Sequence, residues 1–341
     1  MSLHRRSVLP PPLCAQLSAL GTRIGKSDGE LDEVLSGLSV LPANLIVRAS
    51  REIAVTAQLW WRPEQFISLE LLLAKSELQL LRKNPDYAWL FLFHCSGYVR
   101  EAALNAINTP PASPFFFAAL AWRLNDWVGA VRQAATRCAE RVLHRIRADV
   151  AASAAQYLLD RRVVWGRWSD EPKVLDAVFG SKDAMAALAA LLQEQTTGPL
   201  AACLRNALRY PNIDEHLPYL AANAVQPSVR AVACQCLTAG KASWSVGFTW
   251  LWIDKVYGLR RRVPKLEARD LQRNSSAAEW IRKGIHDKSP VVRRVAADAL
   301  IAARAQLPDE SNLIARLAND RSPAVRSRAD FMLRHPPPVP S

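Results

Sequence analysis

The chain of 341 residues lacks any long hydrophobic run. Its longest apolar stretches, Tyr87 to Cys95 and Phe115 to Trp122, reach less than half of the roughly 20 residues that a membrane-spanning helix needs. Near the start, Pro10-Pro11-Pro12 interrupts any apolar core of the kind found in a signal peptide. We therefore expect no membrane insertion and a cytoplasmic protein.

The cysteines lack the spacing of a metal site or redox site. None of the six forms a CxxC pair, and most lie at helix positions suited to alanine, where a free thiol acts as a small hydrophobic group. Cys234 and Cys236 are expected on different faces of one helix. We predict buried, reduced thiols, with a metal or disulfide role as the lesser alternative, and no metal and no cofactor.

Catalytic motifs are also missing. The six histidines are scattered, and the sequence contains no HExxH, no defensible Ser/His/Asp arrangement and no GxxxxGK[ST] phosphate loop. We predict no catalytic residue.

What the sequence does contain is a repeated Val-Arg pair that opens a helical run rich in small residues. The arginines are separated by 52, 32, 98, 63 and 33 residues, and the last four gaps fit one, three, two and one units of roughly 32 residues. The first gap requires an insertion. The six arginines are Arg48, Arg100, Arg132, Arg230, Arg293 and Arg326.

The clearest copies also show how each helix begins. Asp287 and Asp320 precede their arginines by six residues, and Ser289-Pro290 and Ser322-Pro323 lie between them. A serine at the N-cap accepts a backbone N–H, and a proline in the first turn loses no helical hydrogen bond. Pro227 takes the same place without the serine. We therefore predict helix starts at these prolines.

Each arginine is followed by a small residue three positions on and by a large apolar residue seven positions on, which share a helix face. Such a helix is suited to close packing against a partner helix. The small residues are Ala103, Ala135, Ala233, Ala296 and Ala329, and the large ones are Ile107, Leu237, Leu300 and Leu333.

This order of Asp, Pro, Val-Arg, Ala and Leu resembles the HEAT repeat, especially the bacterial HEAT-like type also found in phycobilin lyases. The resemblance implies an all-α fold, a right-handed α-solenoid of about nine to ten HEAT-like helix pairs. It also implies that Asp126, Asp287, Asp320 and the six arginines form a structural ladder between repeats. We expect one elongated body over residues 1–335, most regular over 285–335, followed by a proline-rich disordered tail over 336–341.

Weaker units fill the gaps near Arg161 to Trp168, Gly198 to Leu208 and Arg260 to Pro264. Because we find no sustained alternation, we expect essentially no sheet. The segment Ser243 to Val256 departs most from the repeat style and is the best candidate for a surface elaboration.

Charge supplies the main functional clue. The net charge is +13, and residues 255–294 contain twelve basic and four acidic side chains. This patch has three interpretations: a solvated face without a partner, a surface for an acidic protein, or a surface for nucleic acid. Its candidate binding residues are Arg260, Arg261, Arg262, Lys265, Arg269, Arg273, Arg282 and Lys283.

Tryptophans lie near and within this patch. Trp244, Trp250 and Trp252 lie just before the basic stretch and Trp280 lies inside it, an interleaving that could stack on exposed bases. Trp252 and Trp280 are the preferred candidates. Core packing is expected for most of the eleven tryptophans, including those in apolar contexts, which are Trp60, Trp61, Trp89, Trp122 and Trp127.

A family of alkylpurine DNA glycosylases is also built from HEAT-like repeats and uses tryptophans and an aspartate. Trp122, Asp126, Trp127 and Arg132 are superficially similar to that site, although Asp126 is already explained by the ladder. A phycobilin lyase is less favoured, since only the generic repeat is shared. The sequence thus favours a non-catalytic bacterial adaptor or scaffold that binds an acidic protein partner mainly through its basic C-terminal repeats. The alternative is a nucleic-acid-binding solenoid, and the oligomeric state stays open.

Overall fold

The computed structural model describes residues 7–23, 29–59, 77–167, 172–272, 276–303, 307 and 309–335. The chain divides into two compact units, Met1–Ala184 and Met185–Ser341, with the boundary inside α11 (Lys182–Glu194). The single body expected over 1–335 stays a prediction. The expected tail at 336–341 and the insertion between Arg48 and Arg100, much of it at 60–76, lie largely outside the described residues.

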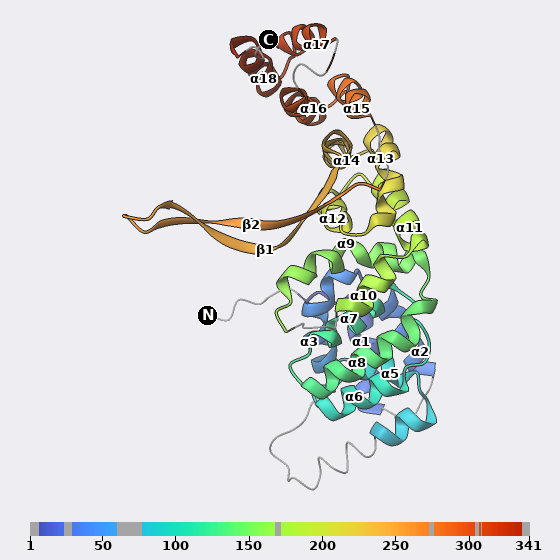
Figure 1. Ribbon diagram of the computed structural model, residues 1–341. Helices are drawn as coiled ribbons and strands as arrows, with labels where there is room; N and C mark the ends of the chain where they lie inside the picture. The colour runs from blue at the N-terminus through green and yellow to red at the C-terminus, as the bar shows by residue number, and fades with distance from the viewer. Residues whose placement is uncertain are drawn as a thin grey trace. The chain divides into compact units, whose positions relative to one another are not determined.

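Unit 1 is built from helices (Figure 1). Helix α7 lies in its core, because Phe115, Phe117 and Leu120 are fully buried and α7 packs on α3, α8 and α9. The bounds are α1 Pro11–Arg23, α2 Gly29–Ser39, η1 Ala43–Leu45, α3 Ile46–Thr56, α5 Tyr87–Phe91, α6 Gly97–Ala106, α7 Pro114–Leu124, α8 Gly129–Val142, η2 Leu143–Arg145, α9 Ala148–Val164 and α10 Pro172–Phe179.

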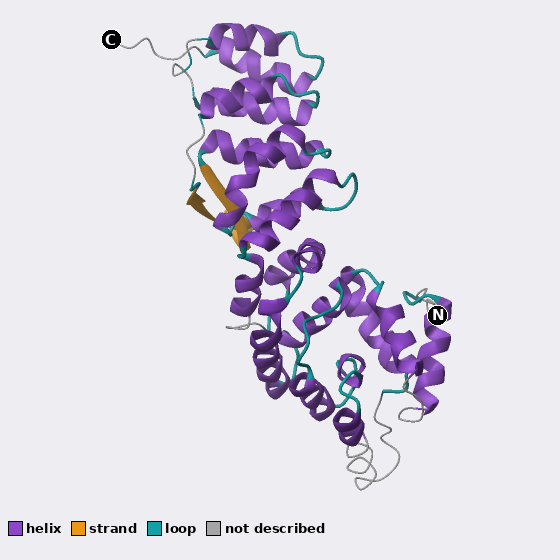
Figure 2. Cartoon of the chain, turned by 90° about the vertical axis from the view of Figure 1, so that its right-hand side faces the viewer, coloured by secondary structure: helices purple, strands orange, loops and turns teal. Residues whose placement is uncertain are grey.

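Unit 2 continues with helices that pack in consecutive pairs. Figure 2 shows these pairs lying one above another. Within this unit α13 packs on α14, α15 on α16 and α17 on α18, while α16 also contacts both α14 and α18. The bounds are α12 Leu200–Ala207, η3 Pro211–His216, α13 Leu217–Asn223, α14 Pro227–Ala239, β1 Lys241–Asp254, β2 Leu259–Asp270, α15 Ala277–Ile285, α16 Pro290–Ala302, α17 Glu310–Ala318 and α18 Pro323–Arg334.

The predicted helix starts are confirmed. Helices α14, α16 and α18 begin at Pro227, Pro290 and Pro323. The Ser289 hydroxyl accepts the Val291 N–H at 3.3 Å, as an N-cap should. Ser322 makes no such bond, so the predicted serine cap is wrong in that copy.

The small residues of the repeat are buried as predicted. All five alanines have no exposed surface, and Ile107, Leu237 and Leu300 are buried too. The prediction is wrong for Leu333, because this side chain is 62% exposed and the neighbouring Met332 is buried instead. It lies one residue before the end of α18, where no later helix among the described residues covers it.

A regular contact joins successive motif copies. Arg293 donates through Nε and Nη2 to both oxygens of Asp320, at 2.6 and 2.8 Å, and through Nη1 to the Asp287 carbonyl at 2.9 Å. Arg230 pairs with Asp287, and Arg100 with Asp126, in the same geometry. These paired side chains are largely buried, so the predicted structural use of these residues agrees with their contacts.

The expectation of essentially no sheet is wrong. Strands β1 and β2 form an antiparallel two-stranded hairpin. The missed signal is the alternation of Phe248, Trp250 and Trp252 with Thr249 and Leu251, because rings on every second residue are typical of a strand.

The hairpin also corrects the repeat count. Arg230 and Asp287 are 57 residues apart, against 27 for Arg293 and Asp320. The difference of 30 equals the length of the segment from Lys241 to Asp270. The gap of 63 residues therefore contains one motif spacing of 33 residues plus the hairpin. The weak unit expected at Arg260 to Pro264 is a strand and not a pair of helices.

Candidate binding site on a hairpin arm

The hairpin projects from unit 2 as an arm (Figure 1). We call residues 241–270 the arm and its residues 246–266 the distal arm. At the root, the Leu271 N–H donates to the Gly240 carbonyl at 3.0 Å, so the two ends of the arm meet. Ala242 is completely buried there.

Arg269 fixes this root to the helices. Its guanidinium donates to both oxygens of Asp214, at 2.6 and 2.7 Å, and to the carbonyls of Leu208 and Tyr210. The Gln272 N–H also donates to Asp214. Both side chains of the pair are largely buried. Arg269 therefore orients the arm, and its charge is already neutralised by a carboxylate.

The distal arm, in contrast, is open to solvent. It contains five basic side chains and one acidic one. Arg260, Arg261, Arg262 and Lys265 are all exposed, as expected for a solvated face. Large apolar side chains are exposed beside them, at Phe248, Trp250, Leu251, Trp252, Ile253, Val256, Tyr257, Leu259 and Leu266.

One face of the distal arm carries aromatic rings and arginines in alternation. Directly opposed residues of an antiparallel pair share a face, and Trp250 opposes Arg262 while Trp252 opposes Arg260. The Arg260 guanidinium carbon lies 4.4 Å from the Trp250 ring centroid and 5.7 Å from that of Trp252. That of Arg262 lies 3.9 Å from the Phe248 centroid. We call Phe248, Trp250, Trp252, Arg260 and Arg262 the ladder face of the arm, which is distinct from the ladder of aspartates and arginines between motif copies.

The opposite face also carries cations. Arg261 opposes Leu251, and Lys265 opposes Gly247, which places both on the other side of the ribbon. Positive charge thus surrounds the distal arm, because Arg260 and Arg262 lie on one face and Arg261 and Lys265 on the other.

The tip is held by its own turn. The Asp254 carboxylate accepts the N–H groups of Val256 and Tyr257, at 2.8 and 3.2 Å. Gly258 has a φ of +66°, a left-handed conformation that glycine adopts without strain. The single acidic side chain of the distal arm is therefore engaged by the backbone.

The other candidates of the basic patch lie elsewhere. Arg282 donates to both oxygens of Asp309, and Lys283 pairs with Glu279 on the same helix. Arg273 lies outside the described residues. Trp280 is only 6% exposed, so its indole is closed to a stacking base, whereas Trp252 is 48% exposed.

The residues compared with a glycosylase site do not form an open carboxylate. Asp126 is buried and accepts from Arg100, Arg123 and the Val128 N–H. Burial lowers the pKa of Arg123 to about 10, which still keeps it charged beside Asp126 at neutral pH. Trp127 is exposed, contrary to the core position expected for it.

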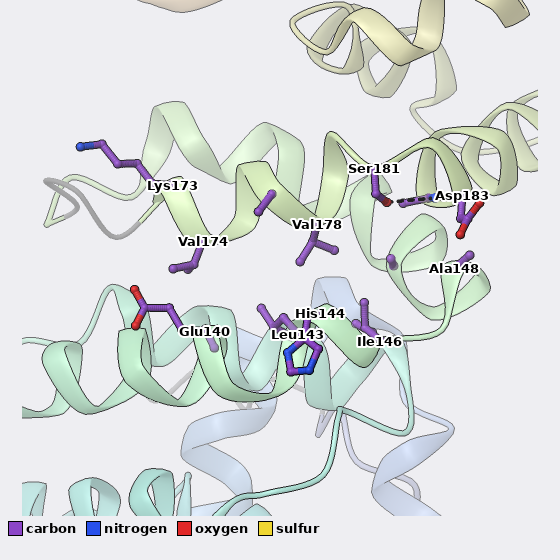
Figure 3. A pocket seen from close by; sticks show the side chains of 14 residues that line it. Glu140, Leu143, His144, Ile146, Ala148, Lys173, Val174, Val178, Ser181 and Asp183 are labelled. Atoms are coloured by element: carbon purple, nitrogen blue, oxygen red, sulfur yellow. Dashed lines mark hydrogen bonds between the residues drawn. The ribbon is translucent and has the colours of Figure 1, made fainter.

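A cavity of 660 Å³ lies in unit 1 between α8, η2, α9 and α10 (Figure 3). Its lining is mostly alanine, valine, leucine and isoleucine, and it also includes Glu140, His144, Lys173 and Asp183. The Ser181 hydroxyl there accepts the Ala184 N–H. This is the pattern of a helix cap beside an apolar groove, without a nucleophile and base in contact.

Four of the six cysteines are buried as predicted, namely Cys138, Cys203, Cys234 and Cys236, whereas Cys14 is half-buried and Cys95 is exposed. Burial raises the pKa of Cys203 and Cys236 to about 12. Among the described residues, no cluster of three or more His, Cys, Asp or Glu side chains could hold a metal ion. Within the same residues, every helix is too short or too polar to cross a bilayer.

Comparison with known proteins adds no family: no family model and no curated protein matches this sequence. The candidate site therefore depends on the arm's own chemistry. The sequence predicted four of its cations and placed Trp250 and Trp252 beside the basic stretch. It did not predict Phe248 or the link between Arg269 and Asp214, because their partners become visible only when the strands are paired.

Proposed function

We propose that this chain is a non-catalytic adaptor, in which HEAT-like helix pairs of a right-handed α-solenoid carry the arm and the arm binds a negatively charged partner. The observation that supports this most is the ladder face, where arginines are stacked on exposed aromatic rings. Arginine and aromatic side chains are enriched at binding surfaces, and arginine recognises carboxylate or phosphate with paired hydrogen bonds.

Stacking also prepares the arginines for binding. A free arginine side chain loses rotamer freedom when it binds, and a ring that already holds the guanidinium reduces that loss. The apolar side chains at the tip add contact area that a protein surface with an acidic rim would bury. An acidic protein is accordingly one form of the partner, as the sequence suggests.

Nucleic acid is the second candidate, favoured by a separate observation. Cations occur on both faces of the ribbon, and phosphates are the densest source of negative charge that could surround it. The free thiols support a cytoplasmic location for either function, and the bacterial origin suggested by the repeat type is part of the same proposal.

Affinity capture from the native cell tests the proposed function. The bait is the full chain, at about 50 mM and about 500 mM salt and with or without nuclease, since only ionic contacts weaken steeply over this range. A matched bait has residues 245–266 replaced by Asn-Gly, which joins the paired residues Trp244 and Glu267 by a tight turn and keeps Arg269.

The expected result is a partner retained by the full chain at low salt and lost from the shortened arm. A nuclease-resistant signal identifies a protein partner, and a nuclease-sensitive signal identifies nucleic acid. Equal capture by both baits would show that the arm is not the binding surface.

A further inference from the structure

The distal arm is a two-stranded ribbon with solvent on both faces and at both edges, apart from partly covered residues such as Val263. Its dimensions are those of any antiparallel pair, with strands about 5 Å apart and side chains standing off both faces. A ribbon of this kind fits the major groove of B-form DNA, which is about 12 Å wide. It enters the minor groove, about 6 Å wide, only where the DNA is bent and that groove is widened.

The distribution of charge matches a groove better than a flat surface. A flat acidic surface would pair with one face and leave the cations of the other face in solvent. The two walls of a groove are both lined with phosphates, so Arg260 and Arg262 would meet one wall while Arg261 and Lys265 meet the other.

The stacked rings argue against a single strand as the ligand. Single-stranded binding relies on bases that stack on open aromatic rings. Here the guanidinium groups of Arg260 and Arg262 already lie over Trp250 and Phe248. The rings therefore support arginines, whose N–H edges stay open to phosphate or to guanine in the groove.

The root keeps the ribbon in a defined direction. Arg269 binds Asp214 and two backbone carbonyls, and Ala242 is buried against the helices. A fixed arm loses less entropy on entering a groove than a flexible tail would.

We propose that the arm binds double-stranded DNA by lying in its major groove, with the ladder face toward one phosphate wall and Arg261 and Lys265 toward the other. This inference rests on the proposed function, since it requires the arm to be the binding surface. Sequence preference is expected to be weak, because contacts to phosphate carry no direct sequence information.

Fluorescence anisotropy with the full chain tests this proposal. The probes are a labelled 20-base-pair DNA duplex, its single strand, and an RNA duplex of the same sequence. Binding to the DNA duplex should be at least tenfold tighter than to either other probe, because the major groove of A-form RNA is too narrow for a ribbon. The dependence of log K on log salt should have a slope of about −4.5, from about 0.9 per phosphate and five distal cations.

Three charge-reversed variants separate the faces. Arg260→Glu with Arg262→Glu removes the ladder-face cations, and Arg261→Glu with Lys265→Glu removes those of the opposite face. The matched control, Arg294→Glu with Arg321→Glu, changes the same charge at exposed positions of unit 2 outside the arm. Each arm variant should weaken duplex binding at least tenfold and reduce the salt slope by about 2, while the control changes affinity less than threefold.

Several results would overturn the proposal. Loss confined to the ladder-face variant would show one-sided binding to a surface and not a groove. Equal or tighter binding of the single strand or the RNA duplex would also overturn the proposal. So would full affinity for the DNA duplex in the chain whose residues 245–266 are replaced by Asn-Gly. Absence of duplex binding at low salt would reject DNA but leave the adaptor intact if the capture experiment still retains a nuclease-resistant partner through the arm.

Discussion

At the scale of single residues, the strongest repeated feature is the arginine that joins two motif copies. In Arg293, Nη1 donates to the carbonyls of Asp287 and Lys288, which precede the same helix. Its Nε and Nη2 donate to Asp320 of the following copy. The resemblance to the HEAT repeat implied this use, since Asp126, Asp287 and Asp320 each precede a motif arginine by six residues. It could not predict the pairing of Arg269 with Asp214 or of Arg282 with Asp309, since neither pair belongs to a repeated motif.

We expect Arg293→Ala to lower the free energy of unfolding by about 1–3 kcal/mol, because it leaves the largely buried Asp320 without its bidentate partner. Arg326→Ala is the matched control. Arg326 donates to the carbonyls of Asp320 and Arg321, and no described helix follows to supply another aspartate. Its loss should cost about 0.5–1.5 kcal/mol. Urea unfolding followed by circular dichroism measures both, and equal costs would contradict the inter-repeat role.

The same pair predicts a dependence on pH. The hydrogen bond from Arg293 holds the pKa of Asp320 below its usual value. A carboxylate with a lowered folded pKa contributes stability above its unfolded pKa of about 4 and loses it as the pH falls through the folded pKa.

Between pH 5 and pH 2, the wild type should therefore lose more stability than Asp320→Asn, which has no charge to lose at this position. Asp330→Asn, at an exposed position of the same helix, serves as the control and should follow the wild type. Thermal unfolding over this range measures the difference. If the stability of wild type and of Asp320→Asn fell in parallel with pH, the ionisation of Asp320 would not be linked to folding.

At the scale of elements, helix α15 approaches α16 and α14 unusually closely. A Cβ added to Gly284 would lie 2.7 Å from the Ala296 Cβ and 3.0 Å from the Cys234 Sγ. Small residues were predicted from the repeat at Ala296, but the need for Gly284 follows only from the packed helices.

We expect Gly284→Ala to destabilise the protein by about 1–3 kcal/mol through overpacking. Gly129→Ala is the control, because its nearest neighbour, the Arg132 Nη2, would be 3.8 Å away and alanine favours a helix. Midpoints of chemical unfolding should fall for the first variant and stay level or rise for the second. The reverse order would show that the close approach is not rigid.

The arm is an inserted element that the spacing of the motifs did not reveal, because its length coincides with that of a repeat. Its 30 residues are nearly one repeat period, so the spacing of the arginines remained compatible with an extra repeat. Only the alternation of Phe248, Trp250 and Trp252 pointed to a strand, and it covers a short window that is exposed on both faces and so lacks the usual apolar and polar alternation.

Because the ends of the arm meet at Gly240 and Leu271, replacing residues 245–266 by Asn-Gly should leave the helices folded. Circular dichroism should show the same helical signal per molecule, and the Tm should change by only a few degrees. A large loss of helix would show instead that the distal arm stabilises unit 2.

At the scale of the whole molecule, the chain has two compact units and helix pairs that contact mainly their sequence neighbours in unit 2. Arrays of this kind are stabilised largely by contacts between adjacent pairs. The periodic motifs predicted this neighbour pattern over 285–335 and, in unit 1, between α6 and α8, which carry Arg100 and Arg132. The other helices of unit 1 follow no spacing that the sequence made evident.

We therefore expect a destabilising substitution in unit 2 to affect only the neighbouring helices of that unit. Asp320→Ala should raise amide hydrogen exchange in α16, α17 and α18, while exchange in α6, α7 and α8 of unit 1 is unchanged, as measured by mass spectrometry. Increased exchange throughout unit 1 would mean that the two units unfold together.

The open edges of the arm have a consequence for solubility. Within the described residues the sheet consists of β1 and β2 alone, so each strand leaves one edge able to pair with a strand of another molecule. Pro264 removes one backbone donor, and the register shifts at Ser245/Gly247 and Trp252/Asp254 bend the edge, but the repulsion between arginine-rich arms is the main protection. Salt screens that repulsion. The ionic conditions that release a negatively charged partner are therefore also the conditions in which free arms are most prone to pair with one another.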